Sequence, residues 1–156
     1  MINNTVFSLT NVTFLSLLKY GSVLLLKMVL MSLVTVIYRI IYRSVASEED
    51  ALFRVGGDKE KRKSLLMKNW NVERVRNAHM NDIENIVPFF IIAILYVTIR
   101  PDPAMAEFLF KVFTASRIAH TTAYLGKIRQ PVRSLAFIAG LFVNIYMIWQ
   151  IMKKVF

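Results

Sequence analysis

Hydrophobic residues fall into four long stretches that cover most of the chain, at about residues 12–41, 71–99, 104–125 and 131–152. A helix of roughly 20 residues crosses the hydrocarbon core of a bilayer, and each stretch reaches that length. The second stretch begins polar and becomes continuously apolar from Ile86. Pro101 and Pro103 separate it from the third, because proline cannot continue a helix. The pattern predicts an all-α, four-helix integral membrane bundle that occupies residues 1–156 as a single domain.

The positively charged residues predict how this bundle sits in the membrane. The third connection carries Lys127 and Arg129, whereas the residues before the first stretch carry no cation. The first connection, residues 42–70, holds seven: Arg43, Arg54, Lys59, Lys61, Arg62, Lys63 and Lys68. Cytoplasmic loops of membrane proteins are enriched in lysine and arginine. We therefore expect residues 42–70 in the cytoplasm and both termini on the opposite side of the membrane.

Composition narrows the function classes. The chain is 56% hydrophobic and lacks cysteine, which excludes a disulfide-stapled module and a cysteine-ligated metal site; no metal ligands are predicted. The net charge of +10 in a soluble protein would suggest nucleic-acid binding. Here many of the cations lie between or at the ends of apolar stretches, so anionic lipid head groups are the expected partners and nucleic acid is not.

Polar residues at membrane depth are costly and therefore point to partners or to function. At 100° per residue, Arg74, Asn77, Asn81, Glu84 and Pro88 of the second stretch fall within an arc of about 80°. One face of that helix thus carries a cation, two amides and a carboxylate. The alternative is that this segment is simply the head-group end of the helix, with its charges paired internally.

The third stretch carries a second polar stripe, in which Arg117, His120, Thr121 and Tyr124 follow helical spacing. This stripe lies at the predicted cytoplasmic end of its helix, as the polar arc of the second stretch does. A lone histidine such as His120 is more often an interhelical hydrogen-bonding residue than a catalyst. Both interpretations remain open at this point.

The fourth stretch begins with Arg133 and Ser134 in its first turn. The helix dipole disfavours a cation at an N-terminus, so Arg133 requires an anion unless it extends to the membrane surface. Arg39, at the end of the first stretch, lies at the same expected depth. Together these groups predict a cationic site that opens to the cytoplasm and accepts a small polyanion beside an apolar molecule.

Residues 72–89, VERVRNAHMNDIENIVPF, closely resemble the second-helix signature of the MAPEG family, the membrane-associated proteins in eicosanoid and glutathione metabolism. Residues 49–51, 117–125 and 130–134 are also similar to family motifs. The resemblance implies a homotrimer, with glutathione as cosubstrate in sites between subunits near the cytoplasmic side. By this resemblance the glutathione-binding residues are Arg39, Arg74, Asn81, Glu84, His120 and Tyr124, and the catalytic residues facing the sulfur are Arg133 and Ser134.

The resemblance implies an enzyme that conjugates glutathione to hydrophobic electrophiles and also reduces lipid hydroperoxides. The alternatives are glutathione-dependent prostaglandin E synthesis and a non-catalytic lipid-binding scaffold. Asn77 and Met80 depart from family arginines, and Met80 weakens the synthase pattern in particular. The implied location is the endoplasmic reticulum, with the outer mitochondrial membrane as the alternative. Because the chain has no cysteine, glutathione must supply the sulfur.

Overall fold

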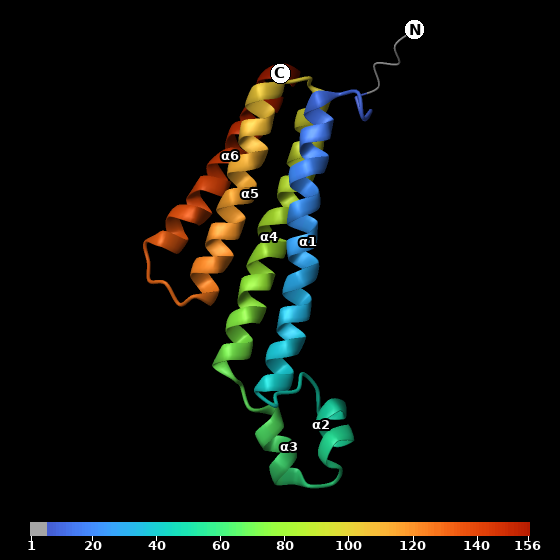
Figure 1. The fold of residues 1–156 in the computed structure, drawn as a ribbon, viewed down its shortest axis with the longest axis vertical. Coiled ribbons are helices and arrows are strands. Elements are labelled where there is room, and N and C mark those ends of the chain that lie inside the picture. The colour runs from blue at the N-terminus through green and yellow to red at the C-terminus, as the bar shows by residue number, and fades with distance from the viewer. Residues whose placement is uncertain (1–5) are drawn as a thin grey trace.

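A computed structural model describes residues 6–156, which form four long helices and two short ones without a strand in that range. The long helices are α1 (Val12–Ile41), α4 (Trp70–Thr98), α5 (Pro103–Leu125) and α6 (Val132–Val155). The short helices are α2 (Glu48–Val55) and α3 (Lys59–Leu66). The four long helices run beside one another, and α2 and α3 extend beyond one end of the bundle (Figure 1). The prediction of an all-α fold is confirmed.

The connection predicted as a loop over residues 42–70 contains α2 and α3. Each begins at a capping side chain: Ser47 accepts a hydrogen bond from Asp50 N, and Asp58 accepts one from Lys61 N. Gly56 lies between the two helices at φ 60°, a conformation that glycine adopts without steric cost. Local capping thus makes two helices of a segment whose high charge suggested a loop.

Three of the long helices, α1, α4 and α6, are long and apolar enough to cross a membrane. Helix α5 falls outside this group because Glu107, Lys111 and Arg117 interrupt its apolar residues. Two of these charges have neighbours in the bundle. Glu107 lies 3.6 Å from Lys19 of α1, and Arg117 is fully buried. The composition of the described residues therefore supports three membrane spans, one fewer than the four that the hydrophobic pattern predicts.

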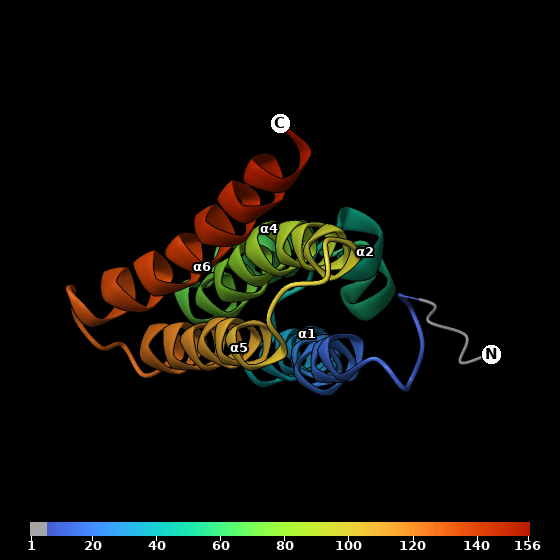
Figure 2. The ribbon, with the colours of Figure 1, turned by 90° about the horizontal axis from the view of Figure 1, so that it is seen from above.

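Helices α4 and α5 each contact the other three long helices, whereas α1 and α6 do not touch each other. Aromatic rings fill the contact between α4 and α5: Phe89 stacks on Phe113 with ring centres 3.9 Å apart and meets Phe110 edge to face. Viewed along the bundle, α6 crosses the others obliquely (Figure 2). Gly140 allows the close approach of α5, since a Cβ there would lie 3.0 Å from Ser116 Oγ.

The ends of the helices bring the predicted site residues toward one end of the bundle. The C-terminal ends of α1 and α5 and the N-terminal ends of α4 and α6 all point away from the C-terminus of the chain (Figure 1). The beginning of α1 lies at the same end as that C-terminus. Residues 1–5, which include the start of the tail predicted to lie outside the cytoplasm, fall outside the described residues.

Candidate functional site

The candidate site is a cleft of about 400 Å³ between the end of α5 and the beginning of α6. Its lining contains four of the predicted residues together with an amide and two apolar side chains: His120, Tyr124, Arg133, Ser134, Gln130, Phe137 and Ile138. Helical spacing places His120 and Tyr124 on one face of α5, one turn apart. The first turn of α6 contributes Arg133 and Ser134, which stand opposite that face.

Tyr124 is the centre of the cationic part of this cleft. The guanidinium carbon of Arg133 lies 4.7 Å from the centre of the Tyr124 ring, and that of Arg74 lies 5.8 Å from it. Arg74 also donates a hydrogen bond to the Tyr124 backbone oxygen at 3.3 Å. The ring thus orders two cations from different helices, an arrangement typical of cation–π contacts. The Arg133 guanidinium is thus held at the Tyr124 ring.

His120 and Ser134 are the other polar groups of the cleft. His120 is buried, and its Nδ1 has no hydrogen-bond partner among residues 6–156, so the interhelical hydrogen bond considered for it is not present at that atom. The Ser134 hydroxyl forms a short hydrogen bond with Oε1 of Gln130, one turn earlier. A hydroxyl donor and an arginine therefore lie side by side in the cleft. This combination stabilises an anionic sulfur or oxygen.

Asn81 is joined to the cleft through Arg117 of α5. An Arg117 guanidinium nitrogen donates to Asn81 Oδ1 of α4, and the other donates to the Ala136 backbone oxygen of α6, each at 3.4 Å. Arg117 thereby ties the polar arc of α4 to the second turn of α6. The same arginine lies against the Phe137 ring, 5.8 Å from its centre.

Two predicted residues lie away from this cleft. Arg39 lines a separate cavity beside Glu73 and Arg76, at the junction of α1 and α4. Glu84 is exposed on α4 and forms no ion pair with any residue between 6 and 156. One copy of the chain thus divides the predicted set over different surfaces.

The departures from the family signature are also exposed. Asn77 and Met80 both lie on the outward side of α4. The ion pair formed within α4 lies outside the polar arc, between two residues that do not belong to it. Arg76 pairs with Glu73 at 3.3 Å, but Arg74 reaches across to α5. The head-group interpretation of this helix end is therefore incomplete.

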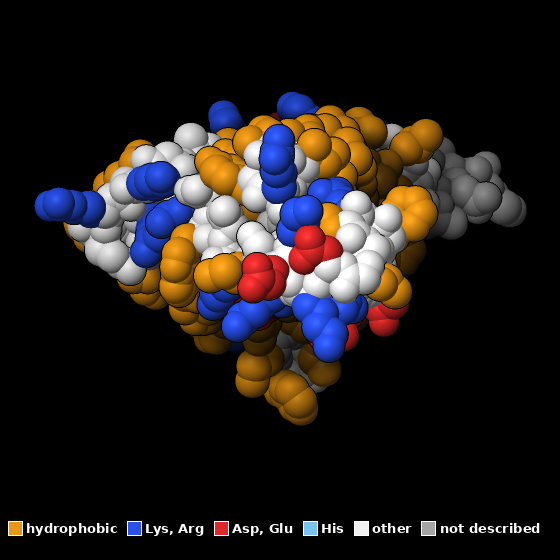
Figure 3. Space-filling view, turned by 90° about the horizontal axis from the view of Figure 1, so that it is seen from below, with side chains coloured by type: hydrophobic (Ala, Val, Ile, Leu, Met, Phe, Trp, Pro, Cys, Tyr) orange, Lys and Arg blue, Asp and Glu red, His pale blue; other side chains and the backbone are white. Residues whose placement is uncertain are grey.

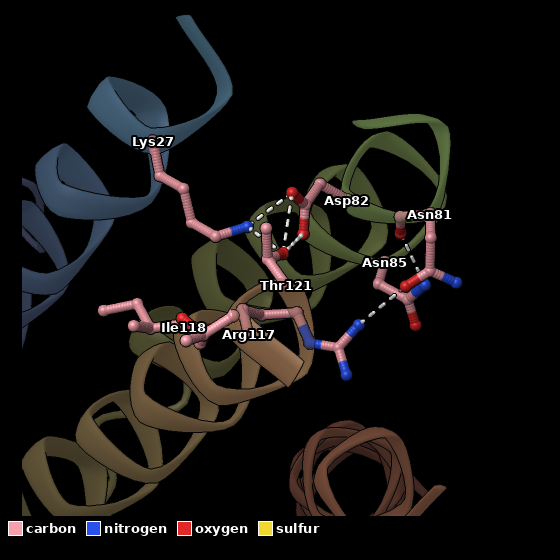
Figure 4. A network of polar contacts seen from close by, with 8 residues as sticks. Lys27, Asn81, Asp82, Asn85, Arg117, Ile118 and Thr121 are labelled. Carbon is pink, nitrogen blue, oxygen red and sulfur yellow. Dashed lines mark hydrogen bonds and ion pairs between the residues drawn. The ribbon is translucent and has the colours of Figure 1, made fainter. Parts of the chain in front are cut away.

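Sequence reasoning missed a buried ionic cluster beside the cleft. Lys27 of α1 donates a short hydrogen bond to the Asp82 carboxylate of α4 and another, at 2.7 Å, to Thr121 Oγ1 of α5 (Figure 4). Thr121 in turn donates to Asp82 at 3.2 Å. Asp82 is fully buried. The available signals were Lys27 within an apolar stretch and Asp82 on α4 outside the polar arc.

Comparison with known proteins gives the class of this helical bundle. The MAPEG family model matches residues 17–153. The chain therefore belongs to the MAPEG family, and the resemblance inferred from residues 72–89 is confirmed.

Particular members of the family cover most of the chain. Microsomal glutathione S-transferase 1 of Homo sapiens is 41% identical over 141 residues, 90% of each chain, and that of Bos taurus is 41% identical over 145 residues, 92% of each. Prostaglandin E synthase of Homo sapiens is 38% identical over 117 residues, which are 75% of this chain and 73% of that protein. Similarity thus extends to both enzymes, over a longer alignment for the transferase.

Proposed function

We propose that this chain is a membrane-bound glutathione transferase, which joins the thiolate of glutathione to hydrophobic electrophiles. The observation that carries the proposal is the cleft in which Arg133 and Ser134 meet Arg74 across the Tyr124 ring. Relatives named microsomal glutathione S-transferase 1 support it with about 40% identity along most of the chain.

The chemistry of the cleft suits a thiol cosubstrate. A thiol becomes a strong nucleophile only as thiolate, and a neighbouring guanidinium favours that form while keeping its own charge. Arg133 is the group that stabilises the thiolate, and the Ser134 hydroxyl exchanges its Gln130 acceptor for the sulfur. With a chloronitrobenzene, a carbon–sulfur bond forms and chloride leaves. With a lipid hydroperoxide, two glutathione molecules become the disulfide while the peroxide becomes alcohol and water.

The division of site residues over the surface supports a glutathione site between copies. Glutathione carries two carboxylates and one ammonium group. Arg39 meets a carboxylate and Glu84 meets the ammonium, with Arg74, Asn81, His120 and Tyr124 completing the binding set. Because Glu84 faces outward and lies apart from the cleft, a neighbouring copy can bring its Arg133 to it. A homotrimer provides that arrangement. In this proposal each subunit has four membrane spans, because α5 crosses the membrane together with α1, α4 and α6.

The same proposal gives the setting of the protein. Residues 42–70 face the cytoplasm, the termini lie on the other side, and the membrane is that of the endoplasmic reticulum or the outer mitochondrion. Apolar electrophiles enter from the bilayer, whereas glutathione enters from the cytoplasm. This division explains why a cationic cleft opens beside apolar residues such as Phe137 and Ile138.

A second candidate function is isomerisation of a prostaglandin endoperoxide, supported by the 38% identity to prostaglandin E synthase. The detergent-purified protein should be assayed with glutathione and a chloronitrobenzene, a lipid hydroperoxide or the endoperoxide. Conjugate formation is the expected result. Prostaglandin E2 formation without conjugation would favour the synthase. Glutathione binding without turnover of any substrate would indicate a lipid-binding scaffold and reject the transferase.

A further inference from the structure

The short helices at the end of the bundle enclose a cavity that the proposed enzyme chemistry does not use. It has a volume of about 490 Å³ and lies between the end of α1 and the pair α2 and α3. Its lining consists of Tyr42, Arg43, Arg54, Val55, Lys61, Ser64 and Leu65. Three cations, a phenol and a hydroxyl thus surround one cavity, and no carboxylate lines it. Several other lysine and arginine side chains lie on this end of the molecule, with a few carboxylates among them (Figure 3).

The two arginines of this cavity lack an anionic partner. Within residues 6–156, neither Arg43 nor Arg54 forms an ion pair. Lys61 is paired with Asp58 at 3.1 Å, and the backbone N–H of Lys61 lowers the pKa of the Asp58 carboxyl by hydrogen bonding to it. That pair is exposed and therefore weak, so Lys61 can still turn toward an anion in the cavity. The cavity keeps a net positive charge.

Two backbone features define the segment that follows α1 beside this cavity. Arg43 follows the last turn of α1 with φ 48°, in the left-handed region that non-glycine residues rarely occupy. Val45 N then donates to Leu65 O at 3.1 Å, which fastens the segment after α1 to the end of α3. The turn after α1 thus places the Arg43 backbone next to the segment that α3 holds.

The cavity lies at the end of an apolar helix. Ile40 and Ile41, the last residues of the apolar helix α1, are 61% and 63% exposed and therefore suit contact with acyl chains. Tyr42 and Arg43 follow immediately, in the order in which tyrosines and cations flank a membrane span at its surface. A ligand in this cavity would hold its charge beside arginines while its apolar part lay along α1.

From this arrangement we propose that the cavity between α1, α2 and α3 binds the phosphate monoester of an anionic glycerophospholipid, of which phosphatidic acid is the simplest. Arg43 and Arg54 bind the phosphate oxygens, Lys61 and Ser64 supply further donors, and the acyl chains lie along Ile40 and Ile41. A phosphate monoester accepts several charge-assisted hydrogen bonds, so two arginines and a lysine favour it over the phosphodiester of phosphatidylserine. Bound lipid thereby fastens the short helices to the bilayer.

The test is a titration of the detergent-purified protein with dioleoyl phosphatidic acid, phosphatidylserine or phosphatidylcholine, followed by native mass spectrometry. The test variants are Arg43→Gly, which keeps the left-handed backbone accessible, and Arg43→Gly combined with Arg54→Gln. The matched control is Lys59→Gln combined with Lys63→Gln, which removes the same charge from α3 outside the cavity. Thermal unfolding and glutathione binding are measured on every variant to establish that it is folded.

We expect wild-type protein to bind phosphatidic acid more tightly than the other two lipids. The Arg43→Gly and Arg54→Gln pair should weaken that binding by about tenfold or more, as loss of charge-assisted hydrogen bonds implies. The control pair should bind almost as wild type. An equal loss in test and control variants would mean diffuse surface attraction and overturn the site. So would equal affinity for all three lipids.

A further arm separates lipid from soluble phosphate. Inorganic phosphate lacks acyl chains and should displace phosphatidic acid only poorly. Displacement by inorganic phosphate at concentrations comparable with those of the lipid would show a soluble-phosphate site and overturn the lipid assignment. Because none of these measurements uses turnover, failure of the proposed transferase activity would leave this result unaffected.

Discussion

Arg133 is the side chain on which the proposed chemistry depends most. Its guanidinium lies over the Tyr124 ring at the N-terminus of α6. The backbone N–H groups of this first turn add positive potential there. Helix α6 has no side-chain cap, so these groups remain available to an anion. A thiolate at this point would satisfy both the arginine and the helix end.

Replacement of Arg133 by alanine should therefore reduce the ultraviolet absorbance of glutathione thiolate on binding. Turnover should fall by roughly a hundredfold or more, as for loss of one preorganised donor to a developing anion. Arg129→Ala is the matched control, because Arg129 is exposed in the adjoining loop and lies outside the cleft. Unchanged thiolate formation and turnover in Arg133→Ala would reject its catalytic role.

The Lys27 and Asp82 pair stabilises the bundle at the level of single side chains. Its carboxylate is fully buried and its ammonium group nearly so, and Thr121 bonds to both. Removing one member of such a pair leaves an uncompensated charge in an apolar environment. Neutralising both members removes both charges, and an amide in place of the Asp82 carboxylate still has the Thr121 hydroxyl as its partner.

Lys27→Met should lower the free energy of unfolding by about 3–5 kcal/mol, the usual effect of breaking a buried pair. Combining it with Asp82→Asn should recover much of that loss. Denaturation of the purified protein followed by circular dichroism measures both. Simple addition of the two single effects in the double variant would contradict direct coupling between these charges.

Helix α6 is the element whose position decides whether the cleft exists. It contacts α5 closely at Gly140 and is tied by Arg117 to α4, while it does not touch α1. The distance between α5 and α6 is thus set by a residue without a side chain. A larger residue there would push the two helices apart and with them the residues facing each other across the cleft.

In Gly140→Leu, overpacking should destabilise the protein by about 1–3 kcal/mol. The higher helix propensity of leucine stabilises it by only roughly 0.8 kcal/mol, so the overpacking should dominate. It should also raise the KM for glutathione by displacing Arg133. Gly57→Leu is the control, since a Cβ at Gly57 meets nothing within 4 Å. Thermal unfolding and steady-state kinetics provide the measurements. Wild-type stability of Gly140→Leu would show that this contact does not set the helix spacing.

In the proposed homotrimer, the assembled protein rather than one chain is the unit in which the glutathione site is complete. Glu84 is exposed and does not line the cleft, so under the proposed function the ammonium and the sulfur of one glutathione bind to groups from two copies. Glu84→Gln should consequently weaken glutathione binding in a calorimetric titration, although Glu84 is on α4 and Arg133 is on α6. Equal affinity would place the ammonium contact elsewhere.

Mixed assemblies test the shared site more directly. Neither Arg133→Ala nor Glu84→Gln subunits alone should have full activity. Co-expression should restore about a quarter of the sites. With equal amounts of the two variants, each subunit has an even chance of carrying Arg133 and its neighbour has an even chance of carrying Glu84. Activity no greater than the average of the separate variants would show that each copy uses its own Glu84.

The chain pattern alone supplied the four long helices and most of the residues that meet in the cleft. This was possible because apolar stretch length and helical spacing are local properties: His120 and Tyr124 must share a face of α5 wherever α5 lies. The family signature in residues 72–89 is likewise readable without coordinates, and comparison confirmed it.

Contacts between helices were decided only by the tertiary structure. The pairing of Lys27 with Asp82 joins residues 55 positions apart, and no periodicity along either helix specifies such a partner. The same holds for the Arg74 and Arg133 side chains that meet at Tyr124. Helices α2 and α3 show the converse limit, since their caps were present in the sequence but their high charge obscured them. Spacing along the chain determines which residues share a face of a helix, whereas packing determines what that face meets.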